Sequence, residues 1–157
     1  MLRCLPEELK VVKLYHGAAN AVASDVISCK NAVGPVWILV HHYGGGGDTD
    51  LVLSLAEHTA VGESAVAITD TFPIWANTDV SAGDVVSRQT DAANYTIDTG
   101  DSKDHTVMFQ WDPAKFSAGY DCLSVADSGG NASNTCTIFA IYEARDKGDT
   151  LAAAITD

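Results

Sequence analysis

Basic residues are scarce in this chain. Nine lysines and arginines stand against 21 aspartates and glutamates, which leaves a net charge of −12 at neutral pH. A surface of that sign repels phosphate, and the few cations are scattered without forming a stripe that could follow a nucleic-acid backbone. We therefore expect no nucleic-acid partner. The charge indicates a soluble surface or a partner with a basic docking face.

Long apolar runs are missing as well. No stretch of 18 apolar residues occurs, so no membrane-spanning helix is expected. The opening segment Met1–Pro6 carries one early arginine and lacks the apolar stretch of a secretory signal peptide. The sequence therefore gives no sign of export from the cytoplasm in which the chain is made.

Closely spaced cysteines are also absent. The four cysteines, Cys4, Cys29, Cys122 and Cys136, form no C-x-x-C pair. This spacing argues against a zinc ribbon or a redox motif. Without export, the thiols are expected to remain reduced and to serve as small core residues. A bridge between Cys122 and Cys136 is the alternative.

Helical periodicity never persists for three turns. Short apolar or alternating segments take its place, and their spacing is typical of a sandwich or barrel of about ten strands. The expected strands are 11–15, 25–28, 35–40, 51–55, 65–69, 74–75, 85–89, 95–98, 106–111, 122–125 and 135–143. The segment Asp112–Phe116 predicts one helical turn, with Asp112 as N-cap and Pro113 at the first helical position.

The length of 157 residues suits one domain with a core of its own. No linker or repeat divides the chain, and Gly44–Gly47 is too short to be more than a loop tip. We expect a single domain over residues 1–157. The tail 146–157 loses the strand pattern and is interpreted as an arm that orders on a partner. For residues 1–10, an arm and a helix both stay open.

Aromatic residues stand inside the strongest strand signals. The segment Pro35–Val40 is continuously apolar, which favours a strand buried on both faces. Trp37, Trp75 and Trp111 each lie among apolar residues, so we expect core packing. A sugar-stacking platform would use the same residue type and is the alternative.

Five histidines invite a metal or acid–base interpretation. His41 and His42 are adjacent, and neighbours in a strand point to opposite faces, so the two rings cannot easily bind one ion. No H-x-H or H-E-x-x-H spacing occurs. We expect one of the pair to point inward and be hydrogen-bonded, and the other to lie at the surface.

Two acidic segments match parts of known motifs. Asp48–Asp50 resembles the start of a calcium loop but lacks the later ligands. Asp98–Gly100 matches the triplet of aspartic proteases, a chemistry that needs a second carboxylate, and the triplet occurs once. Both are expected to be solvated turns. P-loops, nucleophile elbows and dinucleotide fingerprints are absent too, so we expect no enzyme activity, metal or cofactor.

Five further segments resemble known proteins. They are Phe72–Asn77, Ser87–Ala92, Phe109–Ala114, Gly119–Leu123 and Asn131–Asn134. Together they make the chain similar to small proteins encoded in the structural gene clusters of tailed bacteriophages and prophages. The resemblance runs from Val11 to Tyr142, and its motifs are structural and not catalytic.

The resemblance implies a virion structural protein, and a small acidic β protein fits a capsid decoration, or cement, protein best. Similar proteins adopt all-β, jelly-roll-like antiparallel sandwiches with one or two short helical turns, and they carry no active site. They bind the outside of the major capsid shell as dimers or trimers. The implied partners are the major capsid protein and other copies of this chain, and the implied location is the capsid exterior.

Contacts with the shell or with other copies are expected at the two ends of the chain and at the glycine loop. The residues named for this role are Leu2, Leu5, Leu9, Gly45, Asp48, Leu151 and Ile155. Two other functions stay open. One is a head–tail connector, tail or fibre component, and the other is a carbohydrate-binding module at the virion surface.

Overall fold

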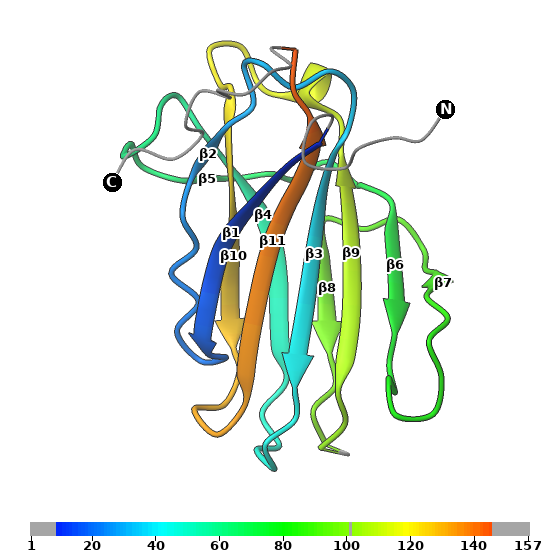
Figure 1. The fold of residues 1–157 in the computed structure, drawn as a ribbon. Coiled ribbons are helices and arrows are strands. Elements are labelled where there is room, and N and C mark those ends of the chain that lie inside the picture. The colour runs from blue at the N-terminus through cyan, green and yellow to red at the C-terminus, as the bar shows by residue number, and fades with distance from the viewer. Residues whose placement is uncertain (1–8, 101, 146–157) are drawn as a thin grey trace.

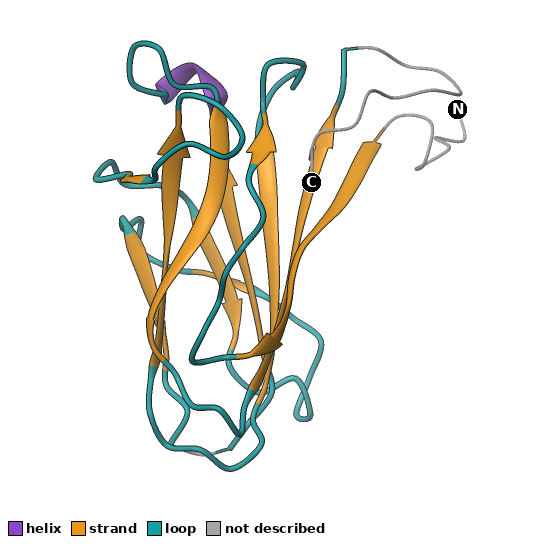
Figure 2. Cartoon of the chain, turned by 90° about the vertical axis from the view of Figure 1, so that its left-hand side faces the viewer, coloured by secondary structure: helices purple, strands orange, loops and turns teal. Residues whose placement is uncertain are grey.

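The computed structural model describes residues 9–100 and 102–145, which form a sandwich of two antiparallel sheets. Figure 1 shows the long strands running along one axis, with sheets connected by loops at both ends. Figure 2 shows the two layers from the side and a helical turn at one end. The expected all-β sandwich is confirmed.

The larger sheet, here sheet A, has six strands in the order β1-β11-β3-β9-β6-β7. Their bounds are β1 Leu9–Ala18, β11 Thr135–Glu143, β3 Val36–Tyr43, β9 His105–Trp111, β6 Ile74–Asn77 and β7 Ser87–Arg88. Every neighbouring pair is antiparallel. Residues that lie opposite one another in such a register point to the same side of the sheet.

The smaller sheet, sheet B, has the order β2-β10-β4-β5, and β8 also pairs with β4. Its strands are β2 Ile27–Ser28, β10 Cys122–Gly129, β4 Leu51–His58, β5 Val66–Ala67 and β8 Asn94–Ile97. When the short strands β5, β6 and β7 are left aside, sheet A has the order β1-β11-β3-β9 and sheet B has the order β2-β10-β4-β8. These two interleaved Greek keys are the jelly-roll arrangement.

The core lies between the sheets and is built by alternation along each strand. In β3, Val36, Ile38 and Val40 are completely buried, while Trp37 and Leu39 are half-buried on the other side of sheet A. The expectation that this strand is buried on both faces is therefore wrong. Its outward side chains are apolar, but no second layer of the described chain seals them off.

The expected helical turn is present as the 3₁₀ turn Pro113–Lys115. The carboxylate of Asp112 accepts a hydrogen bond from the backbone N–H of Ala114 at 3.0 Å, as an N-cap does. Pro113 fits the first position because its missing N–H has no partner to lose there.

Three of the cysteines lie in the interior as free thiols: Cys29, Cys122 and Cys136. This confirms the expected core role and excludes the bridge between Cys122 and Cys136 in this structure. Burial raises the pKa of Cys29 and of Cys136 to about 12, so both stay protonated at neutral pH. In the described part of the chain, no helix has the length and apolar character needed to span a membrane.

One buried side chain holds the glycine loop that follows β3. The amide oxygen of Asn134 accepts hydrogen bonds from the backbone N–H groups of Gly45 (2.9 Å) and Gly47 (3.2 Å), and its amide nitrogen donates to the Gly47 carbonyl (3.2 Å). A Cβ on Gly45 would lie 1.9 Å from the carbonyl oxygen of Ser133, so only glycine fits there. The loop is thus fixed by one amide and by the close approach of two backbones.

Candidate functional site

The outward side of sheet A carries two adjacent rows of apolar side chains. In one row, Val11, Ile141 and Trp37 lie opposite one another in neighbouring strands, and the next row crosses the sheet from β11 to β6. We call the members of both rows the outer face: Val11, Trp37, Leu39, Trp75, Met108, Phe139 and Ile141. Val11 is 50% exposed and the other six are half-buried.

The outer face contains two of the three tryptophans. The rings of Trp37 and Trp75 meet above β9, with their centroids 5.2 Å apart and an interplanar angle of 45°. The guanidinium of Arg88 lies 4.7 Å from the centre of the Trp75 ring, within the range of a cation–π contact. Core packing is confirmed for Trp111, which is 1% exposed, but it is wrong for Trp37 and Trp75.

Among the described residues, charged groups stand only at the margins of this face. Lys13, on β1, lies opposite Phe139 of β11. Arg88, on β7, forms an ion pair with Asp91. Among the outward strand positions of sheet A, the single carboxylate is Glu143, at the end of β11. The centre of the outer face is therefore uncharged, although the chain as a whole carries −12.

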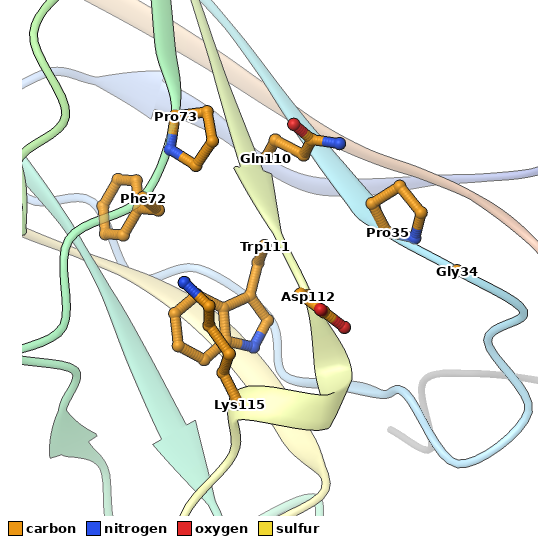
Figure 3. Close-up of a pocket in the computed structure, with 8 residues that line it drawn as sticks. All are labelled: Gly34, Pro35, Phe72, Pro73, Gln110, Trp111, Asp112 and Lys115. Atoms are coloured by element: carbon orange, nitrogen blue, oxygen red, sulfur yellow. The ribbon is translucent and has the colours of Figure 1, made fainter.

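Two hollows lie on either side of Pro35. The smaller, about 220 Å³, opens at the end of the outer face and is lined by Leu9, Val33, Pro35, Trp37, Ile141, Tyr142 and Glu143. The larger, about 360 Å³, is lined by Gly34, Pro35, Phe72, Pro73, Gln110, Trp111, Asp112 and Lys115. Figure 3 shows the larger hollow, with Pro35 and Gln110 on one side and Phe72 and Pro73 on the other.

The polar groups of the larger hollow do not form a catalytic pair. The Asp112 carboxylate caps the helical turn. The other two polar side chains, Gln110 and Lys115, do not make a nucleophile–base pair with one another. The indole N–H of Trp111 is buried without a hydrogen-bond partner among the described residues. The hollow can hold an apolar group beside polar ones.

His41 and His42 point to opposite sides of the sheet, as expected, but the hydrogen bond expected for the inward ring is not formed. His41 is exposed on the outward side of β3, and His42 points inward and is completely buried. Inside the sandwich, His42 lies opposite His105, with the ring centroids 5.8 Å apart. The hydrogen bond expected for the inward ring is absent. No described group lies within bonding reach of either nitrogen of His42 or of His105.

Burial controls the protonation of this histidine pair. Burial, reinforced by His105, lowers the pKa of His42 from 6.5 to about 4. The pKa of His105 is lowered for the same reason, although nearby carboxylates such as Asp98 and Asp104 oppose the change. Both rings are therefore neutral at pH 7. The described residues contain no group of three or more His, Cys, Asp or Glu side chains that could hold a metal ion.

A contact between His58 and Ser124 could not be predicted from local sequence patterns. The Nε2 atom of His58 lies 2.7 Å from the Ser124 hydroxyl, and its Nδ1 atom lies 2.8 Å from the Glu63 carbonyl oxygen. The two residues meet because β4 and β10 are neighbours, although 66 positions separate them in the chain. His58 is 4% and Ser124 5% exposed, so the pair has little access to a substrate.

The two acidic motifs occupy turns. Asp50 accepts a hydrogen bond from the backbone N–H of Thr99 at 3.2 Å, and this bond joins the two motif segments. Asp98 accepts from the backbone N–H of Gly100 at 3.0 Å, as an aspartate in a turn often does. These carboxylates therefore hold loops in place.

The residues expected to contact partners are spread over the molecule. Leu9 begins β1 at one end of sheet A, and Gly45 and Asp48 lie in the loop beyond Tyr43 at the opposite end. Leu9 lines the smaller hollow, while Gly45 packs against the backbone of Ser133, in the loop between β10 and β11. Residues 1–8 of the first proposed arm and all of the second, 146–157, lie outside the described residues, and with them four of the residues named for this role: Leu2, Leu5, Leu151 and Ile155.

The comparison with known proteins adds little to this geometry. No family model matches the chain, and no curated protein matches it either. A solved structure from Bacteroides thetaiotaomicron VPI-5482, described as a "putative sugar binding protein", is similar over 73% of this chain, with 12% identity and a TM-score of 0.32. The chain spans 64% of that structure's length. A likeness of this size carries no argument about function.

Proposed function

We propose that the protein is a non-catalytic structural protein of a tailed-phage virion, and specifically a decoration protein on the outer surface of the capsid shell. The observation that carries this proposal is the outer face: seven apolar side chains on one open sheet of a −12 chain. A contiguous group of partly exposed apolar side chains on a sheet is a common feature of protein–protein contacts. The resemblance to phage structural proteins supplies the identity of the assembly.

A decoration protein stabilises a capsid because its binding is coupled to the assembled state of the shell. A protein that binds the assembled shell and not its loosened form stabilises the shell by mass action. Many copies on one particle add their effects, so each contact can be weak. An acidic surface also suits the outside of a capsid better than the inside, where packaged DNA repels negative charge.

The test is direct binding to a capsid. We expect the purified chain to sediment with undecorated tailed-phage capsids and to appear in images as a regular layer of hundreds of copies on the shell. An unrelated acidic β-sandwich of similar size is the control for adsorption. Failure to bind overturns the proposal, and a ring of about a dozen copies at one vertex indicates a connector or tail part instead.

A carbohydrate-binding module is the second candidate, and the Trp37–Trp75 pair is the observation that favours it. Two half-buried indoles, flanked by the Gln110 amide and the Arg88 guanidinium, offer ring faces and hydrogen-bond donors to a sugar. The large aliphatic share of the outer face favours a protein partner, so this function ranks second.

Tryptophan fluorescence separates the two candidates. In dilute solution, a water-soluble quencher is expected to reach Trp37 and Trp75 and to leave the buried Trp111 unquenched. A sugar ligand is expected to protect the first two, and Trp75→Ala to abolish that protection, with Trp111→Phe as the control. If a broad set of oligosaccharides leaves quenching unchanged, the carbohydrate function is wrong.

A further inference from the structure

We propose that β1 is a docking strand, and that an extended, acidic segment of a partner protein pairs with the edge of β1 that faces away from β11. This proposal is independent of the capsid role and concerns a sheet edge, not the outer face. It defines the partner by its conformation and its charge.

β1 differs in length from the other edge strands of the described sheets. It closes sheet A on one side and is ten residues long (Figure 1). The strands at the other edges have two residues (β2, β5 and β7) or four (β8). An edge strand presents a row of backbone N–H and C=O groups with which another strand can pair, and a short edge limits such pairing. In the described chain, β1 is therefore the edge with room for an added strand.

The described loops lie against the second half of this edge. The backbone N–H of Asp25 donates to the Leu14 carbonyl at 2.9 Å, so the loop that follows β1 contacts the strand there. A shift in register between Lys13 and Tyr15 marks the same place. No backbone hydrogen bond joins residues 9–13 to any described segment other than β11. This first half of β1 is the stretch on which a partner strand can pair.

The charge of β1 favours an acidic partner. The strand contains Lys10 and Lys13 and no aspartate or glutamate, in a chain that has 21 acidic residues. Glu143 lies opposite the first residue of β1, and Asp25 follows the bulge, so these two acids stand at the ends of the stretch. At physiological salt, exposed charges more than about 8 Å apart are largely screened. For a segment bound here, the two lysines therefore count for more than the total charge of −12.

The outward side chains of β1 define a short recognition pattern. Leu9, Val11 and Lys13 point to the outward side of sheet A, and Val11 and Lys13 are exposed. An added strand places a side chain about 5 Å from each residue that it lies beside. We therefore expect the partner to carry an apolar residue beside Val11 and, two positions away, an aspartate or glutamate beside Lys13.

Amide hydrogen exchange on the full chain, measured by NMR, tests whether the edge is open. In an edge strand, alternate backbone N–H groups point away from the neighbouring strand. We expect about every second amide of residues 9–13 to exchange rapidly and the others to exchange slowly. Slow exchange of all these amides overturns the proposal, because another part of this chain or a second copy then occupies the edge.

Binding is measured with capped seven-residue threonine peptides that carry one valine and, two residues later, one glutamate. We expect a Kd of about 1 mM, as a few backbone hydrogen bonds would give, and shifts in the amide signals of residues 9–13. Exchanging the glutamate for lysine is expected to weaken binding about fivefold. Methylation of alternate peptide nitrogens, which removes backbone donors, is expected to abolish it. No shift at about 5 mM peptide, or equal binding of the methylated peptide, contradicts strand pairing.

Charge exchange in the protein locates the binding on β1. Lys13→Glu is expected to weaken the glutamate peptide about fivefold and to strengthen the lysine peptide by a similar factor. The matched control is Lys115→Glu, because Lys115 is equally exposed but lies in the helical turn, and we expect it to change neither affinity. If both variants change binding equally, the peptides respond to net charge and the proposal is wrong. The two peptides on the wild-type chain decide the question even if Lys13→Glu does not fold. Capsids take no part, so failure here leaves the decoration role untouched.

Discussion

Acidification from pH 7 to pH 4 is expected to lower the free energy of unfolding by about 3 kcal/mol through His42 alone. The unfolded chain takes up a proton near the ordinary pKa of 6.5, whereas the folded chain resists protonation of His42 down to about pH 4. The stabilising difference is therefore complete above pH 6.5 and is lost as the pH falls between these two values. The lowered pKa of His105 acts in the same direction.

The geometry explains why the folded state resists this proton. His42 is completely buried, His105 is 4% exposed, and neither ring has a hydrogen-bond partner among the described residues. A second positive charge across 5.8 Å would add repulsion to the cost of burial. The carboxylates of Asp98, Asp104 and Asp79 attract the charge, while Lys103 and His41 repel it.

Replacement of His42 by phenylalanine checks this account. His42→Phe keeps a ring of similar size and removes two unpaired nitrogens, so we expect equal or higher stability at pH 7 and a much smaller loss at pH 5. His41→Phe is the matched control, because His41 is its neighbour on the exposed side of β3. Urea unfolding at a series of pH values is the measurement. An unchanged pH dependence in His42→Phe would show that other groups cause the acid loss.

Removal of the Asn134 side chain is expected to cost about 3 kcal/mol of folding free energy. Asn134→Ala would leave the backbone N–H groups of Gly45 and Gly47 and the carbonyl of Gly47 without the partners they have now. The side chain is completely buried, so water cannot readily replace it. The loop ties the end of β3 to the start of β11, and its release would loosen both strands.

The control for this prediction is Asn94→Ala. Asn94 lies exposed on β8, and we expect its replacement to change stability by less than about 0.5 kcal/mol. Urea unfolding of both variants at pH 7 gives the comparison. If Asn134→Ala loses less than about 1 kcal/mol, the loop does not depend on this amide.

Local patterns were enough to predict most of the strands. The segment 106–111 alternates, with Val107, Phe109 and Trp111 on one side, and β9 indeed buries these three side chains. Asp112 followed by Pro113 predicted the helical turn. Such signals are readable in sequence because a strand repeats every two residues and a cap depends on adjacent positions.

The partners of each strand were not readable in the same way. The segments 85–89 and 95–98 are close in sequence, yet β7 pairs with β6 in sheet A while β8 pairs with β4 in sheet B. The His58–Ser124 contact and the Asn134 loop clamp likewise join residues far apart in the chain. These contacts depend on long-range packing, which a local pattern does not encode.

The sequence by itself determined that this is an acidic chain built mainly of strands, because composition and period-two alternation are local properties. Only the tertiary structure decided which apolar side chains lie inside. Trp37 and Trp111 were both expected in the core, yet Trp111 enters the core and Trp37 joins the outer face. In β3 both sides are apolar, so alternation cannot say which side meets the second sheet; the register with β9 and the packing on sheet B decide it.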